Sequence, residues 1–162
     1  MKFLRSLLAL ALALAFSLTL APPAVHAADV IVTAASVVPG SRARIVTGIA
    51  GATITAGQTV YLDSATNTYK LADANASATT SAVVGIAVSG AASGQYVSVN
   101  IEDDDFTPGF SLTTGTVYVL SATAGGIAPV ADLTTGWYPG VVLIAKSSTK
   151  AVLKIARGSV AQ

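Results

Sequence analysis

Cysteine is absent from this chain of 162 residues, and histidine occurs once, as His26. Without cysteine, the fold has to be stabilised by burial, β-pairing and association of subunits. Because His26 falls in the N-terminal leader considered below, the rest of the chain has no imidazole for general-base chemistry and no imidazole or thiolate to bind a metal. We therefore expect a protein that is not an enzyme and that uses no cofactor.

Charge is also scarce, since only 10% of the residues are charged. The chain has nine basic residues, so without Lys2 and Arg5 seven remain against eight acidic ones, a formal charge of −1 for residues 28–162. This balance offers no basic face for nucleic acid. A surface with so few charges favours association, and we expect a homo-oligomer.

The first 27 residues differ in character from the rest. Lys2 and Arg5 precede an apolar stretch from Leu7 to Ala21, and Val25-His26-Ala27 has small residues where a signal peptidase cleaves. As a helix the stretch would reach about 22 Å, which is short of a hydrocarbon core of roughly 30 Å. We expect a hydrophobic leader helix that acts as a secretory signal cut after Ala27. The alternative is an uncleaved anchor, which would be the only contact with a membrane.

A nine-residue motif occurs twice, as Ile54–Leu62 and as Leu112–Leu120. Each copy is followed by a turn, a short apolar stretch and a strand-like segment, at 83–89 and 141–147, with 57 or 58 positions between the copies. Runs of β-branched and aromatic residues bounded by Gly, Asn, Asp and Ser are typical of strands. The sequence thus predicts an all-β fold, a small barrel or sandwich built from two similar tandem units.

The expected order along the chain follows from these units. It is the leader at 1–27, an extended arm at 28–50, a first β unit at 51–101, an acidic linker at 102–110 and a second β unit at 111–162. Strands are predicted near 43–48, 59–63, 68–72, 82–89, 95–102, 116–121, 126–130, 139–146 and 150–157.

Glu102, Asp103, Asp104 and Asp105 form an acidic run in the expected linker. Four adjacent carboxylates cannot all be buried without partners, so they should be solvated, paired across an interface or bound to a cation. Their spacing lacks the alternation of a calcium loop, which favours a solvated charged edge that discourages aggregation. A cation shared with a neighbouring subunit is the weaker alternative.

Phe106, Phe110, Trp137 and Tyr138 are the candidates for ligand or interface contacts. Aromatic rings on a Gly- and Thr-rich loop can stack on sugars or bases, and Trp137 is the best single candidate. The alternative is packing in a core or an interface, which is the commoner use of large aromatic side chains.

The repeated residues also resemble a known family. Residues 56–62 (Ala-Gly-Gln-Thr-Val-Tyr-Leu), 83–89 (Val-Val-Gly-Ile-Ala-Val-Ser) and 92–99 (Ala-Ser-Gly-Gln-Tyr-Val-Ser-Val) are similar to segments of small β-barrel proteins that decorate or cement the capsids of tailed bacteriophages. Residues 114–129 resemble head-decoration and fibre domains. The resemblance implies a virion structural protein on the virion surface that bridges capsid subunits as a trimer or similar oligomer, with the major capsid protein or other virion subunits as partners.

A second hypothesis starts from the leader, because a secretory signal is not expected of a protein that assembles in the host cytoplasm. It describes an exported bacterial surface protein or carbohydrate-binding module, secreted or periplasmic after cleavage. Trp137 and Tyr138 would then be the candidate ligand contacts.

Overall fold

The computed structural model describes residues 29–158 and 161 of the chain. The predicted leader, its helix and its cleavage site after Ala27 lie outside these residues.

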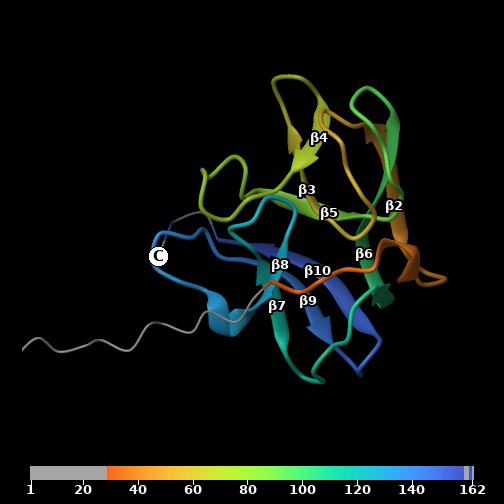
Figure 1. Ribbon diagram of the computed structural model, residues 1–162, viewed down its shortest axis with the longest axis vertical. Helices are drawn as coiled ribbons and strands as arrows, with labels where there is room; N and C mark the ends of the chain where they lie inside the picture. Colours follow the sequence, from red (N-terminus) through yellow and green to blue (C-terminus); the bar gives the residue numbers. More distant parts are fainter. Residues whose placement is uncertain (1–28, 159–160, 162) are drawn as a thin grey trace, which may run out of the picture.

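The described chain folds as a curled antiparallel sheet that forms a half-barrel (Figure 1). The prediction of an all-β fold is confirmed. The sheet has ten strands. Eight of them follow the order β4-β3-β5-β6-β10-β9-β7-β8, and the other two, β1 and β2, pair with β6 outside this path. The elements are η1 (Ala34–Ser36), β1 (Val37–Val38), β2 (Arg44–Ile49), β3 (Thr59–Asp63), β4 (Thr68–Leu71), β5 (Val83–Ala87), β6 (Tyr96–Pro108), β7 (Val117–Leu120), β8 (Ile127–Pro129), η2 (Val130–Asp132), β9 (Gly140–Ala145) and β10 (Ala151–Arg157).

The 13-residue strand β6 holds the sheet together. Asn100 of β6 pairs with Ile86 of β5 on one side and with Ile45 of β2 on the other. Toward its C-terminal end, β6 pairs with β10 along the edge that β5 occupies earlier in the strand. Its last two residues pair with β1 along the edge that β2 occupies earlier. A long central strand therefore has neighbours along both of its edges.

Two segments differ from the sequence-based expectation. The acidic run expected in a linker lies inside β6, because the strand continues from Tyr96 to Pro108. The segment expected to be an extended arm does not stand free, since β1 and β2 both pair with β6 of the same chain and η1 interrupts it. Both differences arise because β6 is longer than predicted: the strand includes the acidic run, and its length gives β1 and β2 an edge to pair with.

The buried apolar side chains form two clusters. The smaller cluster lies between β2, β3, β5 and the first half of β6, and it consists of Ala50, Ile54, Val60, Ala87, Ala91, Val97 and Val99. The larger cluster consists of Val37, Tyr61, Ala72, Ala74, Val83, Ile86, Phe106, Leu112, Tyr118, Leu120, Ile127, Val142, Leu143, Ala145, Ala151 and Leu153. Because Val60 and Tyr61 belong to different clusters, the two faces of β3 are both buried.

Candidate functional site

The acidic run does not act as one group, because the pleat of β6 sends its side chains to different faces. Asp103 is only 2% exposed. Its carboxylate accepts hydrogen bonds from the Gly40 N–H at 2.8 Å, the Asn100 amide nitrogen at 2.8 Å and the Asp105 N–H at 2.9 Å. These three donors compensate for burial of the carboxylate. Asp103 thus holds the turn at Gly40 against β6.

Asp105 forms an exposed charged edge with two lysines of the β9–β10 hairpin. Its carboxylate lies 3.1 Å from Lys150 Nζ and 3.7 Å from Lys146 Nζ. The two ammonium groups also donate to the backbone carbonyls of Asp105 and Asp104, respectively. The hydrogen bond from Lys150 is the main reason why the pKa of Asp105 is lowered.

A cation site within one chain has little support at this run. Over residues 29–158 and 161, no cluster of three or more His, Cys, Asp or Glu side chains could hold a metal ion. Glu102 and Asp104 are exposed and remain candidates for a cation shared between subunits.

The aromatic candidates pack largely on the core. Phe106 is fully buried in the larger cluster, and Phe110 packs against that cluster with its ring edge-on to Tyr118 at a centroid distance of 5.4 Å. Trp137 is half-buried against the same cluster. Tyr138 is half-buried too, and its N–H donates to the Ala74 carbonyl at 2.8 Å. Burial removes Phe106 from the surface, while Phe110, Trp137 and Tyr138 keep part of their rings accessible.

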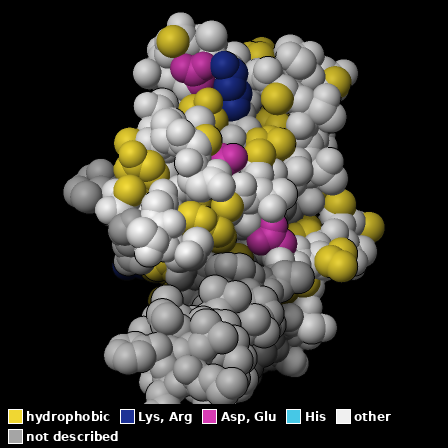
Figure 2. Space-filling view, turned by 60° about the vertical axis from the view of Figure 1, so that its left-hand side comes forward, with side chains coloured by type: hydrophobic (Ala, Val, Ile, Leu, Met, Phe, Trp, Pro, Cys, Tyr) yellow, Lys and Arg dark blue, Asp and Glu magenta, His cyan; other side chains and the backbone are white. Residues whose placement is uncertain are grey.

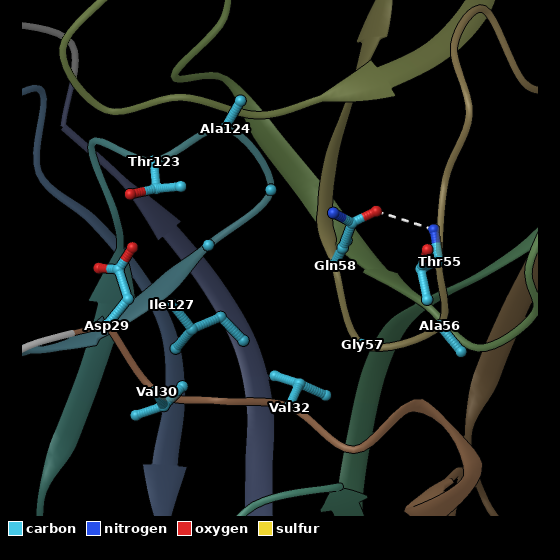
Figure 3. Close-up of a pocket in the computed structure, with 12 residues that line it drawn as sticks. Asp29, Val30, Val32, Thr55, Ala56, Gly57, Gln58, Thr123, Ala124 and Ile127 are labelled. Atoms are coloured by element: carbon cyan, nitrogen blue, oxygen red, sulfur yellow. Dashed lines mark hydrogen bonds between the residues drawn. The ribbon is translucent and has the colours of Figure 1, made fainter.

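A cavity of about 380 Å³ lies where the N-terminal segment crosses two turns (Figure 3). Asp29, Val30 and Val32 line one side, and Gln58 lies opposite Asp29 on the turn before β3. Backbone of the glycine-rich turn between β7 and β8 completes the lining. This cavity could not be predicted from the sequence, because segments that are distant along the chain form it.

Two polar side chains that line this cavity already have hydrogen-bond partners. Gln58 Oε1 accepts the Thr55 N–H at 2.8 Å, and Asp29 Oδ1 accepts the Ser121 hydroxyl at 2.5 Å. The residues that line the cavity include no Lys, Arg or His. The cavity can accommodate a small group, but its chemistry does not select one.

Large apolar side chains are exposed on strands near one side of β6. Tyr96 is 74% exposed, Val38 of β1 51% and Ile45 of β2 45%. Ile45, Thr47 and Ile49 of β2 point away from the smaller cluster, as does Tyr96, which pairs with Ile49. We call these four residues the outer β2 face. A separate polar pocket of about 270 Å³ lies beside the acidic run and is lined by Ser41, Arg42, Asp103, Asp104, Asp105 and Lys146.

Charged groups are sparse elsewhere on the surface as well. Figure 2 shows one side of the molecule, on which a few charged side chains lie among apolar and uncharged polar ones. This distribution agrees with the low share of charged residues in the sequence.

The part of the chain that the structure describes contains no helix with the length and apolar character needed to cross a membrane. Comparison of the chain with protein-family models, with curated proteins and with solved structures finds no match.

Proposed function

We propose that this chain is a non-catalytic virion structural protein that decorates or cements a phage capsid by bridging capsid subunits. The observation that carries the proposal is the exposure of Val38, Ile45 and Tyr96 on paired strands of a rigid sheet. Exposed apolar groups on ordered strands are suited to contacts with another protein surface. The partners would be the major capsid protein or other virion subunits, and the site of action the virion surface.

The segments that resemble decoration proteins support this proposal by their positions. Residues 56–62, 83–89 and 92–99 contribute to β3, β5 and the start of β6, which are neighbours in the sheet. The resemblance therefore concerns one continuous part of the fold and not three scattered turns.

We also propose that the sheet consists of two similar tandem units. In the first half Val60 pairs with Leu71 and with Gly85, and in the second half Tyr118 pairs with Pro129 and with Leu143. Each partner in the second half lies 58 positions after its counterpart. The register of the β3–β5 ladder shifts directly after the Val60 pair, and the register of the β7–β9 ladder shifts directly after the Tyr118 pair.

The turns before β3 and β7 support the same proposal. Gly57 and Gly115 both have positive φ, +92° and +81°, which glycine adopts without steric cost. Their N–H groups donate to Ala87 and Ala145 at 2.7 and 3.0 Å. In this alignment Val60 corresponds to Tyr118, so the spacing is 58 throughout these pairs and not 57.

Capsid binding is the direct test. Purified capsids of the virus that encodes the chain would be mixed with it, and bound protein would be measured after sedimentation together with the temperature at which the capsids release DNA. We expect saturable binding and a higher release temperature. A Tyr96→Ser variant should bind less, whereas Thr114→Ser, in an exposed turn, should bind as the unmodified chain does. Absence of binding would refute the proposal.

The alternative is an exported surface or carbohydrate-binding module, secreted or periplasmic. It is favoured by the partial accessibility of Trp137 and Tyr138 on the loop that precedes β9. Glycan-array binding that is lost in Trp137→Ala would support this alternative, and an array without hits would exclude it. Intact mass of the native protein separates the two settings, since loss of 27 residues indicates export.

A further inference from the structure

Strand β2 has an open edge. One edge pairs with β6 from Arg44 to Ile49, and past the end of β2 the chain forms a single bridge to β4, between Ala50 and Tyr69, whose ring also packs against Gly48. At that bridge the Gly51 N–H donates to the Tyr69 carbonyl at 2.7 Å. Within residues 29–158 and 161, no strand is paired with the open edge between Arg44 and Gly48. β2 runs along the right-hand side of the fold in Figure 1.

The hydrogen bonds identify which backbone groups face this edge. Ala50 donates to Gln95 and accepts from Gly94, each at 2.8 Å, so its polar groups point toward β6. Backbone groups alternate between the two sides of a strand. Gly48 and Val46 therefore also point toward β6, whereas the N–H and C=O groups of Thr47 and Ile45 point to the open edge.

Between Ile45 and Ile49 this edge lacks the usual protection against pairing, since the one irregularity in the ladder of β2 with β6 lies at its start, between Arg44 and Ile45. Natural edges carry charges, proline or bulges, because an exposed row of backbone groups binds other strands. Residues Ile45 to Ile49 contain none of the charged residues or proline. Ile45 is 45% exposed and Thr47 is also exposed. Arg42, Arg44 and Glu102, which pairs with Arg44, lie at one end of the strand, and the Lys70 side chain lies beside Gly51 past the other end.

The second half of the sheet indicates what kind of segment fits here. Strand β2 precedes the first motif copy and pairs with β6. In the same way, the last part of β6 precedes the second motif copy and pairs with β10. The other edge of that part of β6 is covered by β1, an antiparallel strand made of Val37 and Val38. If the two halves correspond as proposed above, the open edge of β2 would take an antiparallel, uncharged, β-branched strand.

We propose that a second copy of this chain fills the edge, with the two β2 strands antiparallel and the two-fold axis at Val46. Ile45 then lies opposite Thr47 of the second copy, and all four outward backbone groups of each strand segment gain partners. Arg44 lies opposite Gly48 of the second copy, and the two Arg44 residues are about 14 Å apart along the strands. A parallel arrangement would instead place the two arginines side by side.

The uncharged sequence Ile45-Val46-Thr47 thus fits its own copy in one orientation. The contact is isologous, so it closes as a dimer and does not propagate. It would revise the trimer that the resemblance to decoration proteins implies. The pairing rests on the backbone of β2 and not on capsid binding, so the free protein should form it.

Sedimentation equilibrium of the purified full chain over a concentration series tests the pairing. We expect a reversible dimer whose dissociation constant rises about tenfold or more in Ile45→Lys, because charge on an edge opposes strand addition. Ile144→Lys is the matched control: Ile144 is 42% exposed on β9, and its substitution should leave the dimer unchanged. A monomer at every concentration, or equal effects of the two lysines, would overturn the proposal.

A backbone test separates pairing from general stickiness. Thr47→Pro removes an N–H that points to the open edge and leaves the bonds to β6 in place, so it should abolish dimerisation while circular dichroism stays unchanged. Thr47→Val keeps the N–H and should dimerise. Hydrogen exchange should show protection of the Ile45 and Thr47 amides that rises with protein concentration. Concentration-independent exchange at both amides would contradict the proposed interface, even if the chain associates elsewhere.

Discussion

The two hydrophobic clusters differ in the size of their side chains. The smaller cluster is built from alanine and valine with one isoleucine, while the larger contains Phe106, two tyrosines and four leucines. Small side chains let strands approach closely, as at Gly48, where an added Cβ would lie 2.5 Å from the Tyr69 ring. The first half of the sheet therefore closes on a compact interior.

The second half depends on the first for its interior. Tyr61, Val83 and Ile86 of β3 and β5 belong to the larger cluster, together with side chains from β7, β9 and β10. The outer side of the first half thus forms one wall of the second half's core. Two units that are similar in pairing are unequal in packing, and we expect one cooperative unfolding transition.

Truncation of Phe106 should have the largest effect on this arrangement. Phe106 is 0% exposed, and Phe106→Ala should lower the free energy of unfolding by about 3–5 kcal/mol, since it leaves a cavity in the larger cluster. Val97→Ala in the smaller cluster removes a smaller side chain and should cost about 2 kcal/mol. Urea unfolding followed by fluorescence measures both. Equal losses would show that the clusters contribute alike and would contradict the comparison.

Removal of the Asp103 carboxylate should have the next largest effect, because β6 is the strand that the two halves share. Asp103→Ala leaves donors at Gly40, Asn100 and Asp105 without their acceptor and should cost about 2–3 kcal/mol. Asp104→Ala, at an exposed position of the same run, should change stability by less than about 0.5 kcal/mol. Thermal unfolding of the two variants under the same buffer compares them. A stable Asp103→Ala protein would mean that the turn at Gly40 needs no anchor.

The strands could be predicted where local signals are strong. The expected strand 59–63 coincides with β3, and 150–157 differs from β10 by one residue, because turn residues bound both runs of β-branched side chains. The continuation of β6 through Asp103 could not be predicted, since the Gly40 N–H that stabilises its carboxylate is 63 positions away. From the sequence alone, a run of carboxylates is predicted to be solvated, because such distant donors are not apparent.

The candidate surface was harder to predict than the fold. The exposure of Tyr96 and the open edge of β2 depend on which strands become neighbours in the sheet. This pairing cannot be predicted from a single sequence. Phe106 is a candidate for a ligand or interface contact by sequence, with core packing as the alternative, and the structure places it in the larger cluster with 0% exposure. Trp137 and Tyr138 remain predictions as ligand contacts.

The smallest expected effect concerns the ion pairs that each half carries at its own hairpin. In the first half Lys70 Nζ lies 2.6 Å from Asp63 Oδ2, and the hydrogen bond from Lys70 is the main reason why the pKa of Asp63 is lowered from 3.8 to about 2. A carboxyl whose folded pKa is lowered stabilises the fold above its unfolded pKa. That contribution should be constant above 3.8 and be lost as the pH falls toward 2.

Replacement of either lysine tests whether the two pairs are independent. In Lys70→Met the pKa of Asp63 should rise but stay below 3.8, because the Ala65 N–H still donates to its carboxylate at 2.9 Å. The lowered pKa of Asp105 should persist in that variant and rise in Lys150→Met, since Lys150 is its main cause. Carboxyl ¹³C titration by NMR reads both groups in one experiment. A shift at Asp105 on replacement of Lys70 would mean that the two hairpins are electrostatically coupled, which their separate partners do not predict.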